Sequence, residues 1–275
     1  MPSEGSRARE LLRLLGFLFA YTALAVAATY PLVTRLGDGV PHDRFDPLLN
    51  TWLLWWNARS VPLSAEWWNG PFFHPLPGVL SFSETLVGLS PLTTPLQWLG
   101  ASPLATYNTA FLLSFALSAF SMHLLCRSLR MRPALCVVAG LAFGFAPYRA
   151  GHLAHLQVLS TQLIPLVFLG LHRFVETGRR RWLLLFAAAW ALQGLTNGYY
   201  LVFLSVLIGC WLLWFIPPGR GGTRLALVLV AWFLAALALT PVLRGYALWH
   251  ARYGFERSLG EIGRASCRER VLRLV

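Results

Sequence analysis

Apolar runs of roughly 20 residues, free of charged side chains, recur along the chain and constrain its fold more than any other feature. A helix needs about 20 apolar residues to cross the hydrocarbon layer of a bilayer. Only helices and closed barrels satisfy their backbone hydrogen bonds there, and the sequence lacks the alternating pattern of barrel strands. Charged residues make up 12% of the chain, against about 25% in soluble domains. We therefore expect an all-α, polytopic transmembrane helical bundle.

The apolar runs predict seven membrane spans. The first, residues 14–33, follows Arg7, Arg9 and Arg13 and is longer than the roughly 7–15 apolar residues of a secretory signal. We therefore interpret it as a retained signal anchor and not as a cleaved signal peptide. The other spans are expected at residues 104–126, 134–150, 156–174, 182–197, 199–216 and 225–243.

The arginines predict how these spans are oriented. They gather in every second loop, and loops rich in arginine face the cytoplasm. The N-terminus is therefore expected in the cytoplasm and the long loop, residues 34–103, outside it. The net charge of +12 then reflects membrane topology and not nucleic-acid binding. The arginines of the predicted cytoplasmic loops are Arg127, Arg130 and Arg132, then Arg179, Arg180 and Arg181, then Arg220 and Arg224.

The long loop is expected to contain two helices at the bilayer surface. The first begins at Asp46, a natural N-cap residue, and Pro47 suits the first helical position. Trp52 and Trp56 then recur at helical spacing on an apolar stripe, while polar residues such as Asn50 face elsewhere. A stripe of this kind favours the bilayer interface.

A second interfacial helix is expected to begin near Ser81. The segment Ser81-Phe-Ser-Glu84 has the capping-box pattern, and an apolar stretch follows it to Leu99. Pro91 and Pro95 indicate that this stretch is broken or re-entrant and not a clean span.

The last residues differ in composition from the rest of the chain. The segment Glu261-Ile-Gly-Arg-Ala-Ser-Cys-Arg-Glu-Arg-Val271 resembles the translated read-through of a sequencing-library adapter. We interpret residues 261–275 as a non-native tail, the alternative being a genuine basic tail. Residues 1–260 are then expected to form one transmembrane domain, truncated at its C-terminus.

Polar side chains gather on the predicted outer side, whereas the span centres lack Asp, Glu and Arg. An ion-coupled transporter is expected to place ionisable residues near the midplane, so this pattern disfavours one. An enzyme at the outer leaflet needs a carboxylate to take a proton and a cation to bind a phosphate leaving group. Asp38, Asp43 and Asp46 are candidates for the first role, alone or with a divalent metal ion, although a turn is the favoured interpretation of Gly37-Asp38-Gly39. Arg149 is the candidate for the second.

The acidic candidates also have structural interpretations. Asp46 can cap its helix and Glu84 can complete its capping box, and we weigh these roles equally with catalysis. Asp43 has no competing local role, which favours function.

Two histidines and two tryptophans are further candidates. His152 and His155 are three residues apart, so on a helix they share a face and can bind a metal ion or a phosphate. Hydrogen bonding to Gln157 or to lipid headgroups is the favoured interpretation. Trp52 and Trp56 suit an interfacial belt and can also stack on a sugar ring. No complete set of metal ligands is apparent, so the metal stays open.

Three segments carry a resemblance to a family of membrane enzymes. They are Asp46-Pro-Leu-Leu-Asn-Thr-Trp-Leu-Leu-Trp-Trp56, Phe82-Ser-Glu84 and Pro147-Tyr-Arg-Ala-Gly-His-Leu-Ala-His-Leu-Gln157. With the order of elements over residues 1–260, they resemble the C-type (GT-C) membrane glycosyltransferases, and more closely a group of bacterial GT-C-like membrane proteins. In that family one helix leads into a large external loop, which holds interfacial helices and an essential Asp near its start.

The resemblance implies an inverting glycosyl transfer at the outer face of the bacterial inner membrane. The donor would be a polyprenyl-phosphate sugar, and a hydroxyl group would be the acceptor. The family's aspartate maps onto Asp46, with Asp43 second. The paired acidic motif of some branches is absent, which leaves dependence on a divalent metal ion open.

By the same resemblance, Arg149 with His152 or His155 would hold the lipid phosphate. Glu84 would orient one of these groups. The competing class is a non-catalytic or transporting membrane protein for lipid-linked glycans, which predicts no dependence on the loop carboxylates. Membrane lipids are expected contacts, and protein partners stay unknown. The binding residues of the competing class would line a central cavity, for which the polar cluster is Gln193, Thr196, Asn197 and Tyr199.

Overall fold

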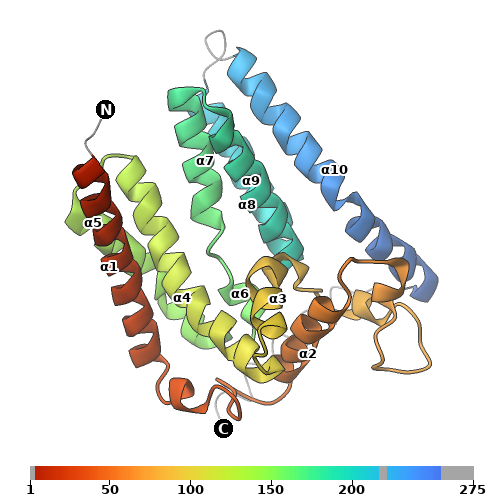
Figure 1. The fold of residues 1–275 in the computed structure, drawn as a ribbon. Helices are drawn as coiled ribbons and strands as arrows, with labels where there is room; N and C mark the ends of the chain where they lie inside the picture. Colours follow the sequence, from red (N-terminus) through yellow and green to blue (C-terminus); the bar gives the residue numbers. More distant parts are fainter. Residues whose placement is uncertain (1–3, 217–221, 255–275) are drawn as a thin grey trace. The chain divides into compact units, whose positions relative to one another are not determined.

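The computed structural model describes residues 4–216 and 222–254, and its elements over these ranges are helices (Figure 1). No strand occurs within these ranges, so the predicted all-α fold is confirmed. The tail proposed for residues 261–275 lies outside the described residues. The α-helices are α1 (Glu4–Ala28), α2 (Asp46–Arg59), α3 (Ser90–Trp98), α4 (Pro103–Ser128), α5 (Pro133–Gly144), α6 (Leu156–Leu159), α7 (Ile164–Thr177), α8 (Arg180–Thr196), α9 (Gly198–Phe215) and α10 (Gly222–Tyr253). Single turns of 3₁₀ helix are η1 (Leu32–Arg35), η2 (Ala65–Trp68), η3 (Val79–Phe82), η4 (Val87–Leu89) and η5 (Pro147–His152).

The chain divides into two compact units, residues 1–239 and 240–275. The first holds the bundle and the long loop. The described part of the second is the last stretch of α10, in which Pro241 is followed by aromatic contacts between neighbouring turns. There the rings of Tyr246 and His250 lie 5.9 Å apart, and the guanidinium of Arg252 lies 5.3 Å from the ring of Trp249.

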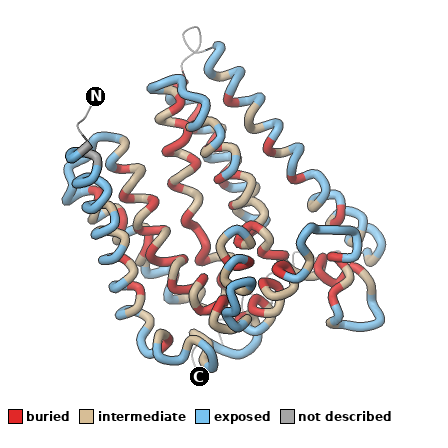
Figure 2. Tube along the Cα trace, viewed as in Figure 1, coloured by how far each residue is buried: buried red, intermediate tan, exposed pale blue. Residues whose placement is uncertain are grey.

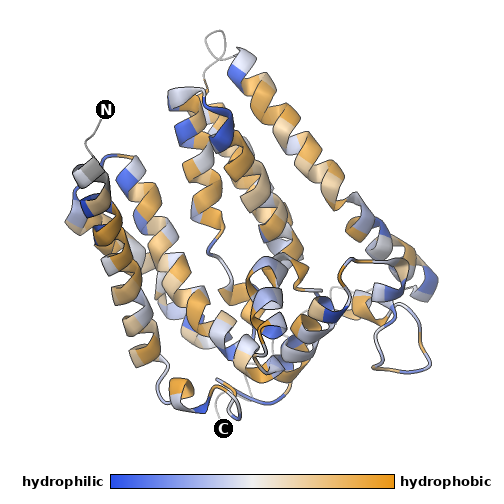
Figure 3. Ribbon diagram, in the orientation of Figure 1, coloured by the Kyte–Doolittle hydropathy of each residue, from blue (hydrophilic) through white to orange (hydrophobic). Residues whose placement is uncertain are grey.

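Six helical stretches within the described residues are long and apolar enough to cross a membrane, and hydrophobic residues run along them in Figure 3. The chain is therefore a multi-pass membrane protein. Helix α8 has 17 residues, about 26 Å at 1.5 Å per residue, and is the remaining predicted span. A total of seven spans stays a prediction. The six stretches are Ala8–Ala28, Pro103–Ser128, Pro133–His152, Leu156–Thr177, Gly198–Phe215 and Gly222–Tyr253.

Two predicted spans are broken where continuous helices were expected. Helix α5 ends at Gly144, and residues 160–163 separate the single turn of α6 from α7. Pro147 and Pro165 follow the two breaks directly, and proline lacks an N–H and disfavours a helical conformation in the preceding residue. Irregular backbone at membrane depth is tolerated where it is buried in protein or lines a water-filled cavity. These breaks therefore mark a place where polar chemistry is possible inside the bundle.

Helix α4 is the centre of the first unit. It contacts α1, α5 and α7, and at its first turns also α2 and α3 (Figure 1). Figure 2 shows buried residues along most of its length, whereas α1 is largely exposed. Small residues bring α5 close, since a Cβ added at Gly144 would lie 2.5 Å from Ala119 Cβ. Helix α4 therefore joins the long loop to the breaks around η5 and α6.

Helix α2 begins at Asp46 as predicted, and the face that it buries in the protein is partly polar. Its buried face includes Asn50 and Asn57, whereas Leu48 is exposed. Asn57 donates to the Thr85 carbonyl at 2.8 Å and accepts from the indole of Trp67 at 2.9 Å. Because these amides are paired inside the loop, α2 is packed among protein elements over its polar face.

The second interfacial helix differs from its prediction. Its long α-helical part, α3, begins at Ser90 and not near Ser81. The hydroxyl of Ser81 donates to the Gly78 carbonyl, and the carboxylate of Glu84 accepts from the amide of Gly198, 114 residues away. The capping-box interpretation of Ser81 and Glu84 is therefore wrong. The stretch is not one continuous helix, because it contains η4 and the nine residues of α3. Pro91 and Pro95 lie inside α3, so the prolines do not form the break that was predicted from them.

Replacing Gly88 by alanine is expected to detach the long loop from α8. A Cβ at this position would lie 2.0 Å from the Leu192 carbonyl oxygen and 2.4 Å from the Thr196 hydroxyl. Overpacking of this kind destabilises by about 1–3 kcal/mol. We expect a lower thermal midpoint for Gly88→Ala in detergent, with an unchanged midpoint for Gly37→Ala, whose added Cβ meets nothing within 4 Å. Equal midpoints for the two variants would contradict this docking.

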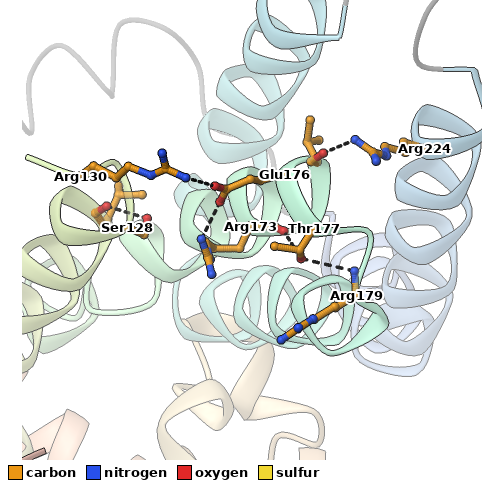
Figure 4. Close-up of polar contacts among 9 residues, drawn as sticks. Ser128, Arg130, Arg173, Glu176, Thr177, Arg179 and Arg224 are labelled. Atoms are coloured by element: carbon orange, nitrogen blue, oxygen red, sulfur yellow. Dashed lines mark hydrogen bonds and ion pairs between the residues drawn. The ribbon is translucent and has the colours of Figure 1, made fainter. Parts of the chain in front are cut away.

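The end of the bundle that carries the predicted cytoplasmic arginines is held by ionic contacts (Figure 4). Glu176 pairs with Arg130 at 2.9 Å and with Arg173 at 2.5 Å, which links the end of α4 to α7. Arg224 donates to the Val175 carbonyl, and Arg127 pairs with Glu10 on α1. Every one of these basic residues lies at the helix ends remote from the long loop. This arrangement agrees with the charge pattern from which the orientation is predicted.

Candidate functional site

Asp46 and His155 meet where the start of α2 approaches the break between η5 and α6. Asp46 Oδ2 lies 3.0 Å from His155 Nε2, and both side chains are partly exposed. No side-chain cap bond is found at the start of α2, and the residue at the cap position is Phe45. The predicted capping role of Asp46 is therefore wrong. Its carboxylate connects two segments 109 positions apart.

Asp43 stabilises the turn before α2, a local role that was not predicted from its sequence context. Its Oδ1 accepts from the Phe45 amide at 3.0 Å, and its Oδ2 lies 2.9 Å from His42 Nδ1. The backbone hydrogen bond from Phe45 lowers the pKa of Asp43, and the contact with His42 and the charge of His155 lower it further. Asp43 is thus an ionised turn residue next to the Asp46–His155 pair.

His152 lies beside His155, but not on a shared helix. His152 ends η5, and His155 precedes α6, with their ring centroids 6.0 Å apart. His152 Nδ1 lies 2.8 Å from the Tyr148 carbonyl oxygen. The predicted hydrogen bond to Gln157 is not made, since the side-chain oxygen of Gln157 accepts from Asn50 at 3.1 Å. No group of three or more metal-binding side chains occurs within the described ranges.

Arg149 is buried inside the bundle against the middle of α4. Only 1% of its surface is exposed, and its guanidinium lies 4.3 Å from the centroid of the Phe115 ring. It donates to the hydroxyls of Thr161 and Ser114, each at 3.2 Å. Its Nε–H is buried without a hydrogen-bond partner. No carboxylate pairs with it among the residues that the structure describes, so this is a buried cation balanced by neutral groups only.

Glu84 lies beside the first residue of α9. Its Oε1 accepts from the Gly198 amide at 3.1 Å. Burial raises the pKa of Glu84 to about 7, and the hydrogen bond from Gly198 opposes the rise only in part. The phenol of Tyr200 lies close enough to both Glu84 and Arg149 for their charges to act on it. Its hydroxyl donates to the Val158 carbonyl at 2.7 Å.

The raised pKa of Glu84 predicts a pH dependence of stability. Its ordinary value is 4.5, so between pH 4.5 and about 7 the folded chain binds more protons than the unfolded chain. Stability then falls as the pH rises through this window and levels off above it. We expect Glu84→Gln to remove this fall from the thermal midpoint measured between pH 5 and 8, while Glu66→Gln, at an exposed residue of the same loop, keeps it. Parallel curves for the wild type and Glu84→Gln would refute the assignment.

Trp52 and Trp56 belong to an aromatic cluster within the long loop. Their rings stack with centroids 5.6 Å apart, and Trp52 also meets the edge of Phe72 at 4.5 Å. The indole of Trp56 donates to the Trp67 carbonyl. Trp56 also lines a surface hollow of ≈ 420 Å³ together with Arg59 and other loop residues. Both tryptophans are already used in packing, and the structure brings neither into contact with Arg149 or His155.

Several polar residues of this region escaped the sequence analysis. Ser114 and Thr161 bind Arg149, and Thr161 also lies 3.0 Å from the Ser118 hydroxyl. These residues had one signal in the sequence. Ser114 and Ser118 are four residues apart, so they share one face of α4, opposite a span that contains proline. Most of the buried polar atoms that lack a partner also come from this outer region: Ser90 Oγ, Thr94 Oγ1, Tyr107 OH, Asn108 Oδ1, Arg149 Nε, His155 Nδ1, Ser160 Oγ, Gln162 Oε1 and Gln193 Oε1.

The polar cluster expected by the competing class serves largely to hold the α8–α9 turn. The side chain of Asn197 accepts from the Tyr199 amide at 2.8 Å and donates to the Gln157 carbonyl. Thr196 bonds to its own helix, and Gln193 donates to the Ser160 carbonyl at 2.8 Å.

The chain matches no family model, and no curated protein or solved structure matches it.

Proposed function

We propose that this chain is a membrane glycosyltransferase that moves a sugar from a polyprenyl-phosphate donor to an acceptor at the outer face of a bacterial inner membrane. Arg149 is the observation that carries the proposal. A buried guanidinium without an acidic partner is unfavourable by itself, and an arriving phosphate is the anion that its planar donors fit best. The resemblance of the three segments to GT-C proteins supplies the polyprenyl donor and the sugar.

The surrounding groups support transfer and not simple binding. Asp46 and His155 form a carboxylate–imidazole pair, which is suited to accept a proton from the attacking group. Arg149 stabilises the negative charge that develops on the departing phosphate. Glu84, with a pKa of about 7, would fix the start of α9 through its hydrogen bond with the Gly198 amide. None of the roles proposed for these residues uses a divalent metal ion.

The proposal is tested by donor consumption. The purified chain is reconstituted in liposomes with radiolabelled polyprenyl-phosphate sugars, offered one at a time with a crude extract of cell-envelope acceptors. We expect one donor to be converted to polyprenyl phosphate and a labelled product. Consumption of none of the donors would favour the competing class of transporting or non-catalytic proteins.

The proposed orientation places the long loop outside the cytoplasm. In a chain whose four cysteines are replaced by alanine, Leu76→Cys adds a thiol to the exposed part of the loop and Met131→Cys adds one between α4 and α5. A membrane-impermeant maleimide added outside spheroplasts should label the first at once and the second only after permeabilisation. The reverse pattern would place the site in the cytoplasm and refute the proposed location.

A further inference from the structure

The Asp46–His155 pair leaves one imidazole nitrogen unused inside the protein. The carboxylate of Asp46 faces Nε2 at 3.0 Å, and because an ionised carboxylate only accepts, Nε2 carries the hydrogen of the neutral ring. Nδ1 then holds a free lone pair. This atom is buried and has no hydrogen-bond partner among the described residues. His155 therefore presents a base to the interior, and Asp46 sets which nitrogen is basic.

The hydroxyl of Tyr107 is a second buried group without a hydrogen-bond partner. It is fully buried on α4, forms no hydrogen bond with a described residue, and lies close enough to Asp46 and Asp43 for their charges to act on it. A ligand hydroxyl group can donate to His155 Nδ1, and it can also accept from a phenol such as that of Tyr107. Leaving such groups unpaired costs about 1–3 kcal/mol each, so a hydroxyl-bearing ligand is favoured there.

We propose that His155 Nδ1 is the general base of the transfer reaction, that Asp46 is its positioning residue, and that the acceptor is accordingly an alcohol. This inference rests on the proposed function. An acceptor that is already ionised, such as a phosphate or carboxylate, would need no base. It would also meet the repulsion of Asp43 and Asp46.

The chemical step balances within these groups. The acceptor oxygen forms a bond to the anomeric carbon as its proton moves to His155 Nδ1. The bond from that carbon to the phosphate oxygen breaks, and the phosphate leaves with the electron pair and is held by Arg149. The imidazolium that results is stabilised by Asp46, as in other carboxylate–histidine pairs. It returns its proton after the products leave, when water can reach Nδ1.

The charges that face His155 are few. Asp46 and Asp43 approach it from the segment at the start of α2, with His42 behind Asp43. His152 faces it from η5. Tyr107 on α4 lies close enough to Asp46 and Asp43 for their charges to act on its hydroxyl.

The kinetic test compares His155→Gln with Asp46→Asn. A general base contributes about 10²–10⁴-fold, so His155→Gln should lower kcat by this factor with little change in KM. The double variant should be no slower than the slower single variant, because the two residues act as a unit. His74→Gln, an exposed histidine of the long loop, should keep full activity. If Asp46 were the direct base, His155→Gln would retain activity within a few-fold, and the proposal would fail.

A second measurement decides the pairing without any turnover. The chain is labelled with ¹⁵N-histidine, and the ring signals of His155 are assigned by their loss in His155→Gln. We expect the neutral ring to be protonated at Nε2 in the wild type and to lose this preference in Asp46→Asn. A ring protonated at Nδ1 in the wild type would overturn the assignment of the base. Failure of donor consumption together with the expected tautomer would instead count against the proposed function alone.

Discussion

Arg149→Met is expected to lower sugar transfer by at least about 10²-fold without lowering thermal stability. Removal of a donor that stabilises developing negative charge typically costs about 10²–10³-fold in rate. The methionine fills a similar apolar volume against Phe115 and carries no charge. Transfer from the polyprenyl-phosphate donor and the thermal midpoint would be measured on the same preparation.

The stability half of this prediction follows from the partners of Arg149. Ser114 and Thr161 keep other hydrogen bonds when it is replaced, to the Phe111 carbonyl and to Ser118. The cost of burying an unbalanced cation disappears at the same time. The midpoint of Arg149→Met should therefore equal or exceed that of the wild type. A purely structural arginine would show the opposite, with the midpoint reduced and any activity lost only through unfolding.

Arg59→Gln is the matched control for Arg149→Met. Arg59 also lies on the outer side, but it is exposed and rests over the Trp55 ring at 4.6 Å. Its replacement should leave transfer unchanged. Equal losses in the two variants would mean that general positive charge near the membrane surface, and not the buried guanidinium, supports activity.

Asp46→Asn is expected to lower kcat by up to the about 10²–10⁴-fold that a general base contributes, because His155 loses the carboxylate that positions it. The amide keeps the shape of the carboxylate, but its NH₂ group can present a donor to Nε2, and the amide does not stabilise an imidazolium. The rate of transfer at saturating donor is the measurement. Asp38→Asn is the matched control, because Asp38 is an exposed turn residue paired with Arg35 at 3.5 Å.

The separate replacement of Asp43 distinguishes the two neighbouring carboxylates. Asp43→Asn keeps an oxygen to accept from the Phe45 amide, so the turn before α2 can persist. Its effect on transfer should be well below that of Asp46→Asn. Unchanged activity in both variants would reject a role for the loop carboxylates and favour the competing class.

The sequence predicted the helices well because the membrane imposes length and apolarity on them. The runs that predict α1, α4, α9 and α10 depend only on their own composition. The start of α2 was predicted for a similar reason, since Pro47 acts locally. The breaks before Pro147 and Pro165 were missed, because surrounding apolar residues gave each region the composition of an uninterrupted span.

The candidate site was only partly predictable, because its contacts join distant segments. Nothing near Asp46 in the chain identifies His155 as its partner, and nothing near Glu84 identifies Gly198. Local patterns instead suggested caps, which the structure does not contain. The residue type of Arg149 indicated an anion site. That Arg149 is buried without a carboxylate partner could be learned only from its packing against α4.

Binding of polyprenyl phosphate, the departing half of the proposed donor, tests the central claim most directly. Native mass spectrometry of the chain released from detergent would count the bound lipid in the wild type, Arg149→Met and Arg59→Gln. The account predicts one bound polyprenyl phosphate for the wild type and Arg59→Gln, and its loss in Arg149→Met. Equal occupancy in all three would contradict the assignment of Arg149 as the phosphate site.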